Sequence, residues 1–408
     1  MTGTVRTQLS VMMFLEFFVW GSWYVTMGIY LPNTLGSDGG EIAMAYSTQS
    51  YGAILAPFVI GLIADRYFNA ERILGVLHLL GAILMYLLYQ ANDFRLFFPY
   101  LLAYMIMYMS TLALVNSVSF NQMKDPGKEF AFVRVFGTLG WIAAGLLISY
   151  LNWDSETGIS EGILRNTFLM AAISSAVLGV FSFTLPKTPP RADTSKKVTL
   201  SDILGLDALS LLKDRNFLIF FLASVLICIP LAFYYQHAGQ FLGEIGVANP
   251  AGKMTIGQIS EILFMLLLPY FFKRFGFKMT MLVAMLAWGV RYLLFAYGDT
   301  GDLVVLLLLG IALHGVCYDF FFVSGQIYTD SKAGKTYKSS AQGLITLATY
   351  GIGMLIGFWA AGKITDAYLL SDGVHDWQMI WMYPAGFAVF VLVLFGLLFK
   401  NVKINYKS

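Results

Sequence analysis

Several ionisable side chains lie inside long apolar stretches of this sequence. His314 and Asp319, for example, fall within the apolar run 303–323. An ionised side chain at the centre of a bilayer costs about 2.5–3.5 kcal/mol even on insertion scales, so such residues usually face a cavity or a partner. They are therefore candidates for binding a polar ligand or a proton, and the set is Glu16, Arg134, His237, Glu261, Arg291, His314 and Asp319.

Helical spacing places two groups of polar residues on single helix faces. Arg134, Thr138 and Trp141 recur at i, i+4 and i+7, which gives a guanidinium, a hydroxyl and a flat indole for a small molecule. Gln258 and Glu261 recur at i and i+3, and their amide and carboxylate suit sugar hydroxyls or the edge of a base. Packing explains the same patterns if Arg134 only marks a helix end, Trp141 packs on a neighbour, and Glu261 pairs with Arg291.

A third group combines His314 and Tyr318, at i and i+4, with Asp319 a further 100° round the helix. A lone buried His is often a hydrogen-bonded structural residue, whereas a buried carboxylate needs a stronger reason.

The run "CIPLAFYYQHAGQF" adds a polar cluster after Pro230, in which Tyr235 is the candidate ligand contact. In membrane proteins, proline kinks beside polar clusters mark binding regions. The sequence does not assign roles to His237, to Arg291 or to the face that carries Glu16, Trp20 and Trp23.

Composition requires a membrane protein with many spans. The 408 residues are 58% hydrophobic and 12% charged, with a mean hydropathy of +0.70, whereas soluble domains carry about 25% charged residues. The net charge of +2 does not indicate a nucleic-acid partner, and the two cysteines lie in apolar runs, so no disulfide framework is expected. No metal-ligand spacing is present either.

Hydropathy and charge together predict twelve transmembrane helices with both termini in the cytoplasm. Of the 26 Lys and Arg residues, 21 fall in alternate connections, and the other connections hold only Arg95, Arg165 and Lys253. Because Lys and Arg accumulate on the cytoplasmic side, Lys196 and Lys403 are expected inside, and Asp38 and Ser155 outside. The predicted spans are 8–32, 41–64, 71–91, 95–119, 130–151, 163–184, 215–242, 254–272, 278–297, 302–327, 339–366 and 377–399.

A polar connection divides the chain into two halves of six helices, 1–184 and 215–408. The connection, 185–214, is Pro-rich and basic, and its segment "SDILGLDALSLLKD" predicts a short amphipathic helix with Ser201 as N-cap. "YLLYQAND" and "YLLFAYGD" align at an offset of 206, and the same offset places Gly137 on Gly343. The predicted fold class is an all-α polytopic membrane protein built from two related halves.

The sequence also resembles a known family. "GLIADR", with Gly61, Asp65 and Arg66, resembles the signature of the major facilitator superfamily between helices two and three. "FFVWGSWYVTMG", "RVFGTLGW", "ILGLDAL", "GQISEILF", "RYLLFAYGD" and "YDFFFVSG" resemble, in order, the bacterial nucleoside:proton symporter family of that superfamily.

The resemblance implies a twelve-helix fold, inward cotransport of nucleosides with protons, and no cofactor. It places ligand contacts at Arg134, Thr138, Trp141, Gln258, Glu261, Tyr318 and Asp319.

The sequence departs from the family's nucleoside binders at four positions. Ala232 and Tyr235 stand where those binders have Gln and Asn, His314 stands at a Tyr position, and Trp141 replaces a Phe. The pattern is closer to a less characterised branch of nucleoside transporters, and the transport class carries over better than the substrate.

A carboxylate whose surroundings change during a transport cycle also changes its affinity for protons. Asp319 or Glu261 is therefore the expected proton carrier, and the sequence does not choose between them. No "GxxxxGK[ST]" motif occurs, which argues against ATP hydrolysis.

Three other functions stay open at this stage. A proton-linked sugar or glycoside carrier would use the same amide, carboxylate and aromatic side chains. A membrane enzyme would need a catalytic constellation at an interface, and a sensor would need a soluble signalling domain. We expect a monomeric protein of the cytoplasmic (inner) membrane, embedded in the lipid bilayer.

Overall fold

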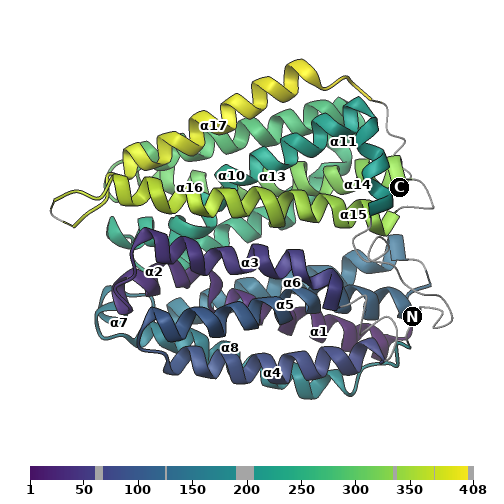
Figure 1. Ribbon diagram of the computed structural model, residues 1–408, viewed down its shortest axis with the longest axis horizontal. Coiled ribbons are helices and arrows are strands. Elements are labelled where there is room, and N and C mark those ends of the chain that lie inside the picture. Colours follow the sequence, from purple (N-terminus) through teal and green to yellow (C-terminus); the bar gives the residue numbers. More distant parts are fainter. Residues whose placement is uncertain (60–67, 125, 190–205, 334–337, 372, 403–408) are drawn as a thin grey trace. The chain divides into compact units, whose positions relative to one another are not determined.

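The computed structural model describes residues 1–402 except 60–67, 125, 190–205, 334–337 and 372. Helices dominate this part of the chain, and its β-structure is limited to one isolated bridge between Leu369 and His375 (Figure 1). The chain divides into two compact units. Unit 1 comprises residues 1–199 and 248–255, and unit 2 comprises residues 200–247 and 256–408.

The helices of unit 1 pack mainly in the pairs α1 with α6, α4 with α8, and α5 with both α3 and α4. Their bounds are α1 (Gly3–Gly21), α2 (Tyr24–Thr34), α3 (Gly39–Val59), α4 (Ala70–Gln90), α5 (Phe94–Gln122), α6 (Pro126–Tyr150), α7 (Glu156–Ser160), η2 (Ile163–Arg165) and α8 (Asn166–Ser182).

In unit 2, α10 packs against α16 and α17. The elements are η3 (Leu206–Lys213), α10 (Arg215–Glu244), α11 (Pro250–Tyr297), α12 (Val304–Ala312), α13 (His314–Tyr318), η4 (Asp319–Val323), α14 (Ser324–Ala333), α15 (Lys338–Thr346), η5 (Leu347–Gly353), α16 (Met354–Ala367) and α17 (Trp377–Leu398). The first residues of α11, up to Thr255, group with unit 1.

Each of the twelve predicted spans coincides with helix in the described residues. The spans 254–272 and 278–297 both fall on α11, which is interrupted at Gly276 with φ 75° and ψ 173°. Only glycine adopts this backbone conformation without strain.

Three sequence predictions fall wholly or partly on undescribed positions. The signature residues Gly61, Asp65 and Arg66 lie outside the described residues, as do the N-cap Ser201 and the topology markers Lys196 and Lys403. The last part of the predicted amphipathic segment is the short 3₁₀ helix η3.

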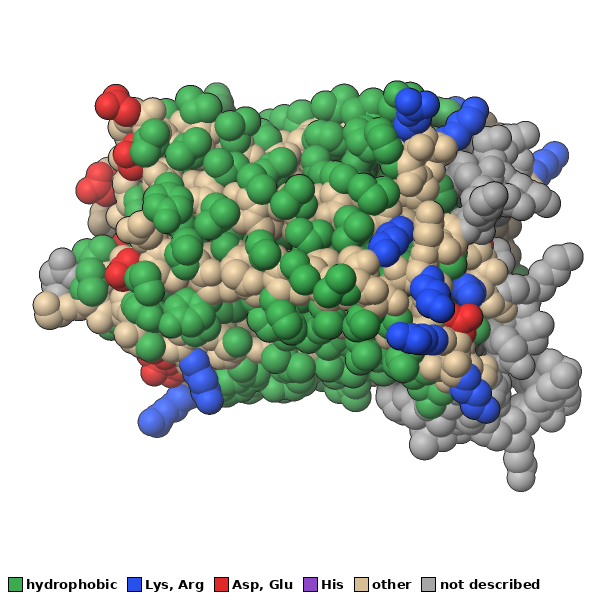
Figure 2. All heavy atoms as spheres, turned by 90° about the horizontal axis from the view of Figure 1, so that it is seen from above, with side chains coloured by type: hydrophobic (Ala, Val, Ile, Leu, Met, Phe, Trp, Pro, Cys, Tyr) green, Lys and Arg blue, Asp and Glu red, His purple; other side chains and the backbone are tan. Residues whose placement is uncertain are grey.

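Hydropathy identifies the chain as an integral membrane protein. Ten helical segments of the described chain are long and apolar enough to cross a membrane. On the face in Figure 2, hydrophobic side chains cover the middle, while most Lys and Arg lie toward one end and most Asp and Glu toward the other. Large apolar side chains such as Leu266 and Leu397, 75% and 80% exposed, suit contact with lipid better than with water.

Aspartate side chains define where three of the spans begin. Asp93, Asp214 and Asp376 precede α5, α10 and α17, and each accepts a hydrogen bond from an amide of the first turn, at 2.9, 2.9 and 3.1 Å. Such caps satisfy backbone donors that have no partner within the helix.

Some spans are less regular than the continuous helices expected from the sequence. The first span breaks at Ser22–Trp23, between α1 and α2. The tenth span breaks at Leu313 and continues as a π-helix from Asp319, and the eleventh contains a second π-helix, η5. Single π-turns inside helices occur frequently at functional sites.

Glycines set the distance between α1 and α6. A Cβ on Gly140 would lie 2.1 Å from the carbonyl oxygen of Phe14, and one on Gly137 would lie 2.7 Å from the Phe17 ring. The two backbones therefore touch, which fixes how α6 presents Arg134 and Trp141.

We predict that G140A lowers the free energy of unfolding by about 1–3 kcal/mol, because the added methyl group overlaps the α1 backbone. The matched control is G386A on α17, where a Cβ meets no atom within 4 Å. Thermal unfolding of both variants in detergent measures the difference. Equal midpoints would show that α1 and α6 can separate at no cost.

Candidate functional site

Two glycines bring α11 against α13 in unit 2. A Cβ on Gly315 would lie 2.5 Å from the backbone of Ser260, and one on Gly257 would lie 3.1 Å from His314 Cβ. The amide of Gly315 donates to Ser260 Oγ at 3.0 Å. This contact places the helix turn with Gln258 and Glu261 beside the turn with His314 and Tyr318.

A fully buried arginine lies at the centre of this region. Arg291 of α11 is 0% exposed, and its Cζ lies 3.3 Å from the centroid of the Tyr234 ring. Its Nη1 lies 3.2 Å from His314 Nδ1, and the Tyr234 and His314 rings stack with centroids 5.4 Å apart. The cation is thus held by aromatic faces and one imidazole nitrogen.

The contact with Arg291 fixes the protonation of His314. A guanidinium can only donate hydrogen bonds, so His314 Nδ1 must accept, and the imidazole is neutral with its proton on Nε2. His314 therefore presents a hydrogen-bond donor at Nε2. The contact at Nδ1 is also compatible with the alternative in which His314 is a hydrogen-bonded structural residue.

The two π-helices meet through tyrosines. Tyr318, which precedes η4, shares a 2.8 Å hydrogen bond with the hydroxyl of Tyr350 in η5, and both side chains are half-buried. Asp319 begins η4 and is fully buried, and Glu261 is 8% exposed. Unit 2 therefore buries two carboxyl groups in the same set of spans as the Arg291 guanidinium.

The polar cluster after Pro230 divides between structure and candidate ligand contacts. His237 is structural, since its ring contacts Gln240 at 2.9 Å and Thr365 of α16 at 3.0 Å. Tyr235 is half-buried, with its ring 6.4 Å from that of His314. Ala232 packs on α16, where a Cβ on Gly357 would lie 2.6 Å from its methyl group.

Sequence reasoning did not select Gln236. Its side chain is fully buried, and among the described residues neither its amide nitrogen nor its amide oxygen has a hydrogen-bond partner. Buried polar atoms almost always have partners, so Gln236 is a further candidate ligand contact. Its place in the polar cluster after Pro230 was the signal that the sequence offered.

In unit 1, the face with Arg134, Thr138 and Trp141 packs partly on α1. The guanidinium of Arg134 lies 4.2 Å from the centroid of the Phe17 ring. The Trp141 ring meets those of Trp20 and Tyr24 edge-on, at 5.4 and 6.3 Å. Arg134 and Trp141 are half-buried and Thr138 is buried, so part of this face stays open.

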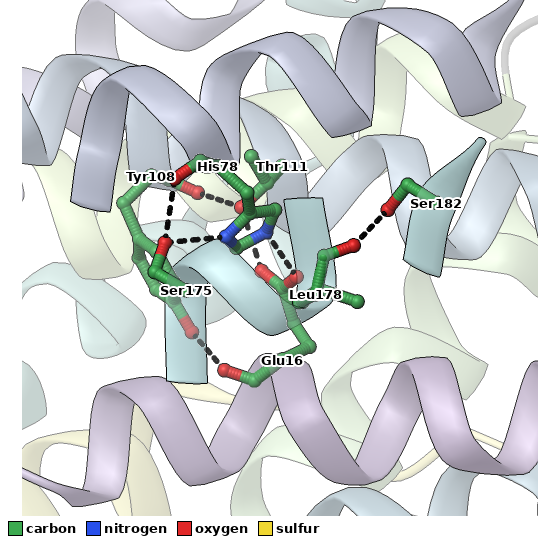
Figure 3. Close-up of polar contacts among 7 residues, drawn as sticks. All are labelled: Glu16, His78, Tyr108, Thr111, Ser175, Leu178 and Ser182. Atoms are coloured by element: carbon green, nitrogen blue, oxygen red, sulfur yellow. Dashed lines mark hydrogen bonds and ion pairs between the residues drawn. The ribbon is translucent and has the colours of Figure 1, made fainter. Parts of the chain in front are cut away.

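Unit 1 also contains a buried Glu–His pair that the sequence did not reveal. Glu16 of α1 and His78 of α4 lie 2.8 Å apart (Figure 3). In the described part of the chain, no group of three or more His, Cys, Asp or Glu side chains is placed to hold a metal ion.

A family model described as "Nucleoside H+ symporter" matches residues 3–403. This chain belongs to the nucleoside H+ symporter family. It is therefore a transporter of the major facilitator type and not an enzyme.

Relatives in Escherichia coli (strain K12) match over almost their full length. "Putative nucleoside transporter YegT" is 43% identical over 402 residues, covering 97% of this chain and 93% of that protein. Xanthosine permease is 35% identical, covering 97% and 96%.

Solved structures agree with the family assignment. The crystal structure of the nucleoside transporter NupG aligns with a TM-score of 0.85 at 32% identity, covering 98% of this chain and all of the other. The peptide-transporter-family protein PepTSo aligns with a TM-score of 0.73 at 15% identity, covering 97% and 98%, which shows a shared fold.

We predict that R291K lowers the free energy of unfolding by about 2 kcal/mol, because a flexible ammonium cannot keep both the Tyr234 ring and His314 Nδ1. R95K is the matched control, since Arg95 is exposed at the start of α5, and we expect it to change stability by less than about 0.5 kcal/mol. Thermal unfolding compares the two. If R291K and R95K unfold alike, the planar guanidinium has no special role.

Proposed function

We propose that this protein takes nucleosides into the cell together with protons, by alternating access between the two sides of the membrane. The observation that carries the proposal is the match of the nucleoside H+ symporter model along residues 3–403. The names of YegT, xanthosine permease and NupG refer to the same class of substrate.

The arrangement of side chains in each unit suits a nucleoside. In unit 1, Trp141 offers a flat ring for a base, where stacking contributes roughly 1–3 kcal/mol in other proteins. Arg134 and Thr138 on the same helix face offer hydrogen-bond donors. These three residues form the unit 1 group of proposed ligand contacts.

In unit 2, Gln258 and Glu261 can hydrogen-bond to the edge of a base or to ribose hydroxyls. On the neighbouring helix, His314 Nε2–H adds a donor, and the Tyr318 hydroxyl, which is linked to Tyr350, can donate or accept. The unit 2 group of proposed ligand contacts is Tyr235, Gln258, Glu261, His314, Tyr318 and Asp319, to which the structure adds Gln236.

The function is tested with purified protein in liposomes that carry an imposed pH gradient. We expect labelled nucleosides to accumulate when the outside is acidic, and accumulation to stop when a protonophore removes the gradient. Free bases, sugars and glycosides are offered in the same assay. Accumulation of a sugar but of no nucleoside would replace this proposal with a sugar carrier.

Asp319 and Glu261 are the proposed proton carriers of unit 2. The variants D319N and E261Q mimic the protonated, neutral side chains. We predict that the carrier's variant loses gradient-driven accumulation but keeps counterflow exchange, which needs no net proton movement. E161Q, an exposed carboxylate on the short connection before α8, is the matched control.

If both variants still accumulate nucleoside in a pH-dependent way, neither carboxylate carries the proton, and Glu16 or His314 becomes the next candidate. Loss of binding in both would make them ligand contacts first and leave their role in proton coupling open.

The proposal also includes the topology of the chain. Two halves, 1–184 and 215–408, are joined by the connection 185–214, and both termini lie in the cytoplasm. The carrier is a monomer in the inner membrane. The alternation of Lys and Arg between connections supports it. We predict that K187C is labelled only from the cytoplasm and E156C, next to Ser155, only from outside. Both native cysteines are buried, which keeps background labelling low. Labelling of both positions from one side would refute this topology.

A further inference from the structure

Glu16 and His78 form a hydrogen-bonded pair in the interior of unit 1. His78 Nε2 lies 2.8 Å from Glu16 Oε2, and the two side chains are 1% and 0% exposed. Figure 3 shows the pair between α1 and α4, with Thr111 and Tyr108 of α5 and Ser175 of α8 around it. Four helices of the unit therefore converge on one ionisable pair.

Ser175 can hold a proton on the far nitrogen of His78. The Ser175 Oγ lies 2.9 Å from the His78 carbonyl oxygen, to which it can donate, and 3.0 Å from His78 Nδ1. A hydroxyl has only one hydrogen. When that hydrogen is on the carbonyl, Ser175 Oγ accepts from Nδ1–H, and Nε2 is left to exchange a proton with Glu16.

Thr111 can serve Glu16 in two protonation states. Its hydroxyl oxygen lies 2.6 Å from Glu16 Oε1 and 2.6 Å from the carbonyl oxygen of Tyr108. When Glu16 is a carboxylate, Thr111 donates to Oε1. When Oε1 carries a proton, Glu16 donates to Thr111, whose hydrogen turns to the Tyr108 carbonyl. An added proton therefore leaves no buried polar group without a partner.

We infer that the Glu16–His78 pair is a proton-binding site of the transport cycle, additional to the carboxyl groups of unit 2. The inference rests on the proposed proton-coupled uptake. With one shared proton the pair is neutral. A second proton gives an imidazolium beside a carboxylic acid, with Nδ1–H still on Ser175 and the Glu16 hydroxyl on Thr111.

Other titratable groups around the pair come from two helices. Helix α5 contributes Tyr104 and Tyr108, which lie within electrostatic range of Glu16. Helix α6 contributes Arg134, whose charge lies within electrostatic range of Tyr108. The sequence of α8, residues 166–182, has no titratable side chain. On α1 and α4 the next titratable groups, Arg6 and Arg72 with Glu71, are at least six residues away along the helix. Proton exchange in this region is thus centred on Glu16 and His78.

The pair is connected to the proposed ligand contacts of unit 1. The Tyr108 hydroxyl donates to the Glu16 carbonyl oxygen at 2.7 Å. One helical turn after Glu16, the Trp20 ring contacts both Tyr108, at 5.5 Å, and Trp141, at 5.4 Å. A change of charge at Glu16 therefore acts on the helix that packs against Trp141.

The first experiment detects the proton directly. Infrared difference spectra of the purified full chain between about pH 8 and about pH 5, the range in which His and perturbed carboxylates titrate, report protonated carboxyl groups through their C=O stretch. We expect one buried-carboxyl band to be present in the wild type and lost in E16Q. A spectrum of E16Q identical to that of the wild type would overturn the inference.

The matched control is E244Q. Glu244 and His375 form the same kind of pair in unit 2, at 2.9 Å, but their side chains are 20% and 14% exposed. We expect the buried-carboxyl band to persist in E244Q. Its loss in E244Q and not in E16Q would assign the proton to Glu244 and refute the inference.

The second experiment measures transport. We expect E16Q to lose about tenfold or more of the accumulation driven by a pH gradient while its counterflow exchange stays within about twofold of the wild type, since tenfold corresponds to about 1.4 kcal/mol of lost coupling. E16Q that accumulates nucleoside with the pH profile of the wild type would exclude Glu16 from the cycle.

A milder variant keeps the inference testable if E16Q does not fold. T111V removes the hydroxyl that serves both states of Glu16. Its bond to a carboxylate is charge-assisted and roughly twice as strong as its bond to the neutral acid, so its loss disfavours the carboxylate. We expect the pH midpoint of uptake by T111V to move upward by about one unit. The control is T346V, an exposed position on α15, and we expect its pH midpoint to stay unchanged. An unchanged midpoint in T111V would refute the inference.

The outcomes separate this inference from the proposed function. Wild-type protein that takes up no nucleoside refutes the function, and the infrared spectra still decide whether Glu16 binds a proton. Wild-type uptake without an E16Q-sensitive band refutes only the proton site.

Discussion

The cost of burying ionisable groups in an apolar chain governs the interior of both units. A charge without a partner is strongly disfavoured in such surroundings. Glu16 therefore lies against His78 and Thr111 in unit 1, and Arg291 lies against Tyr234 and His314 in unit 2. Each partner comes from a different helix. The polar contacts consequently fix the rotation of each helix about its axis, whereas apolar packing alone would allow several rotations.

These contacts require helix backbones to approach closely, and small residues make that possible. At Gly315 and Gly257, α13 lies against α11, and at Gly140, α6 lies against α1. Larger side chains at these positions would move His314 away from Arg291, or Trp141 away from Trp20. Glycine placement and polar pairing are thus two parts of one constraint, since a bond of about 3 Å tolerates little displacement of the helices.

The spans and the family could be predicted from sequence because hydropathy and motif order are local properties. The irregular backbone could not. The break at Leu313 and the π-helix from Asp319 depend on how α13 packs against α11. His78 was missed because its partner is 62 residues away, and a lone His in an apolar span carries no sign of what it meets. The sequence offered Glu261 as a possible partner of Arg291 and gave no sign of the contacts that Arg291 makes with Tyr234 and His314. These two partners also lie on other helices. The roles of the proposed ligand contacts in each unit stay predictions, although their neighbours are now known.

The two units handle buried charge in different ways, and this limits where protons can be exchanged. Arg291 stays charged at all physiological pH values, and its contact keeps His314 Nδ1 an acceptor. The cation and the imidazole thus form a fixed electrostatic background in the unit that holds the proposed proton carriers Glu261 and Asp319. In unit 1 the partner of Glu16 is an imidazole, so a proton can pass between Nε2 and Oε2 without a change in net charge. The guanidinium contact of Arg291 keeps its charge, whereas a buried Glu–His pair can gain a proton and become a cation. The Glu16–His78 pair can therefore convert a change in pH into a change in the charge of a helix-packing contact.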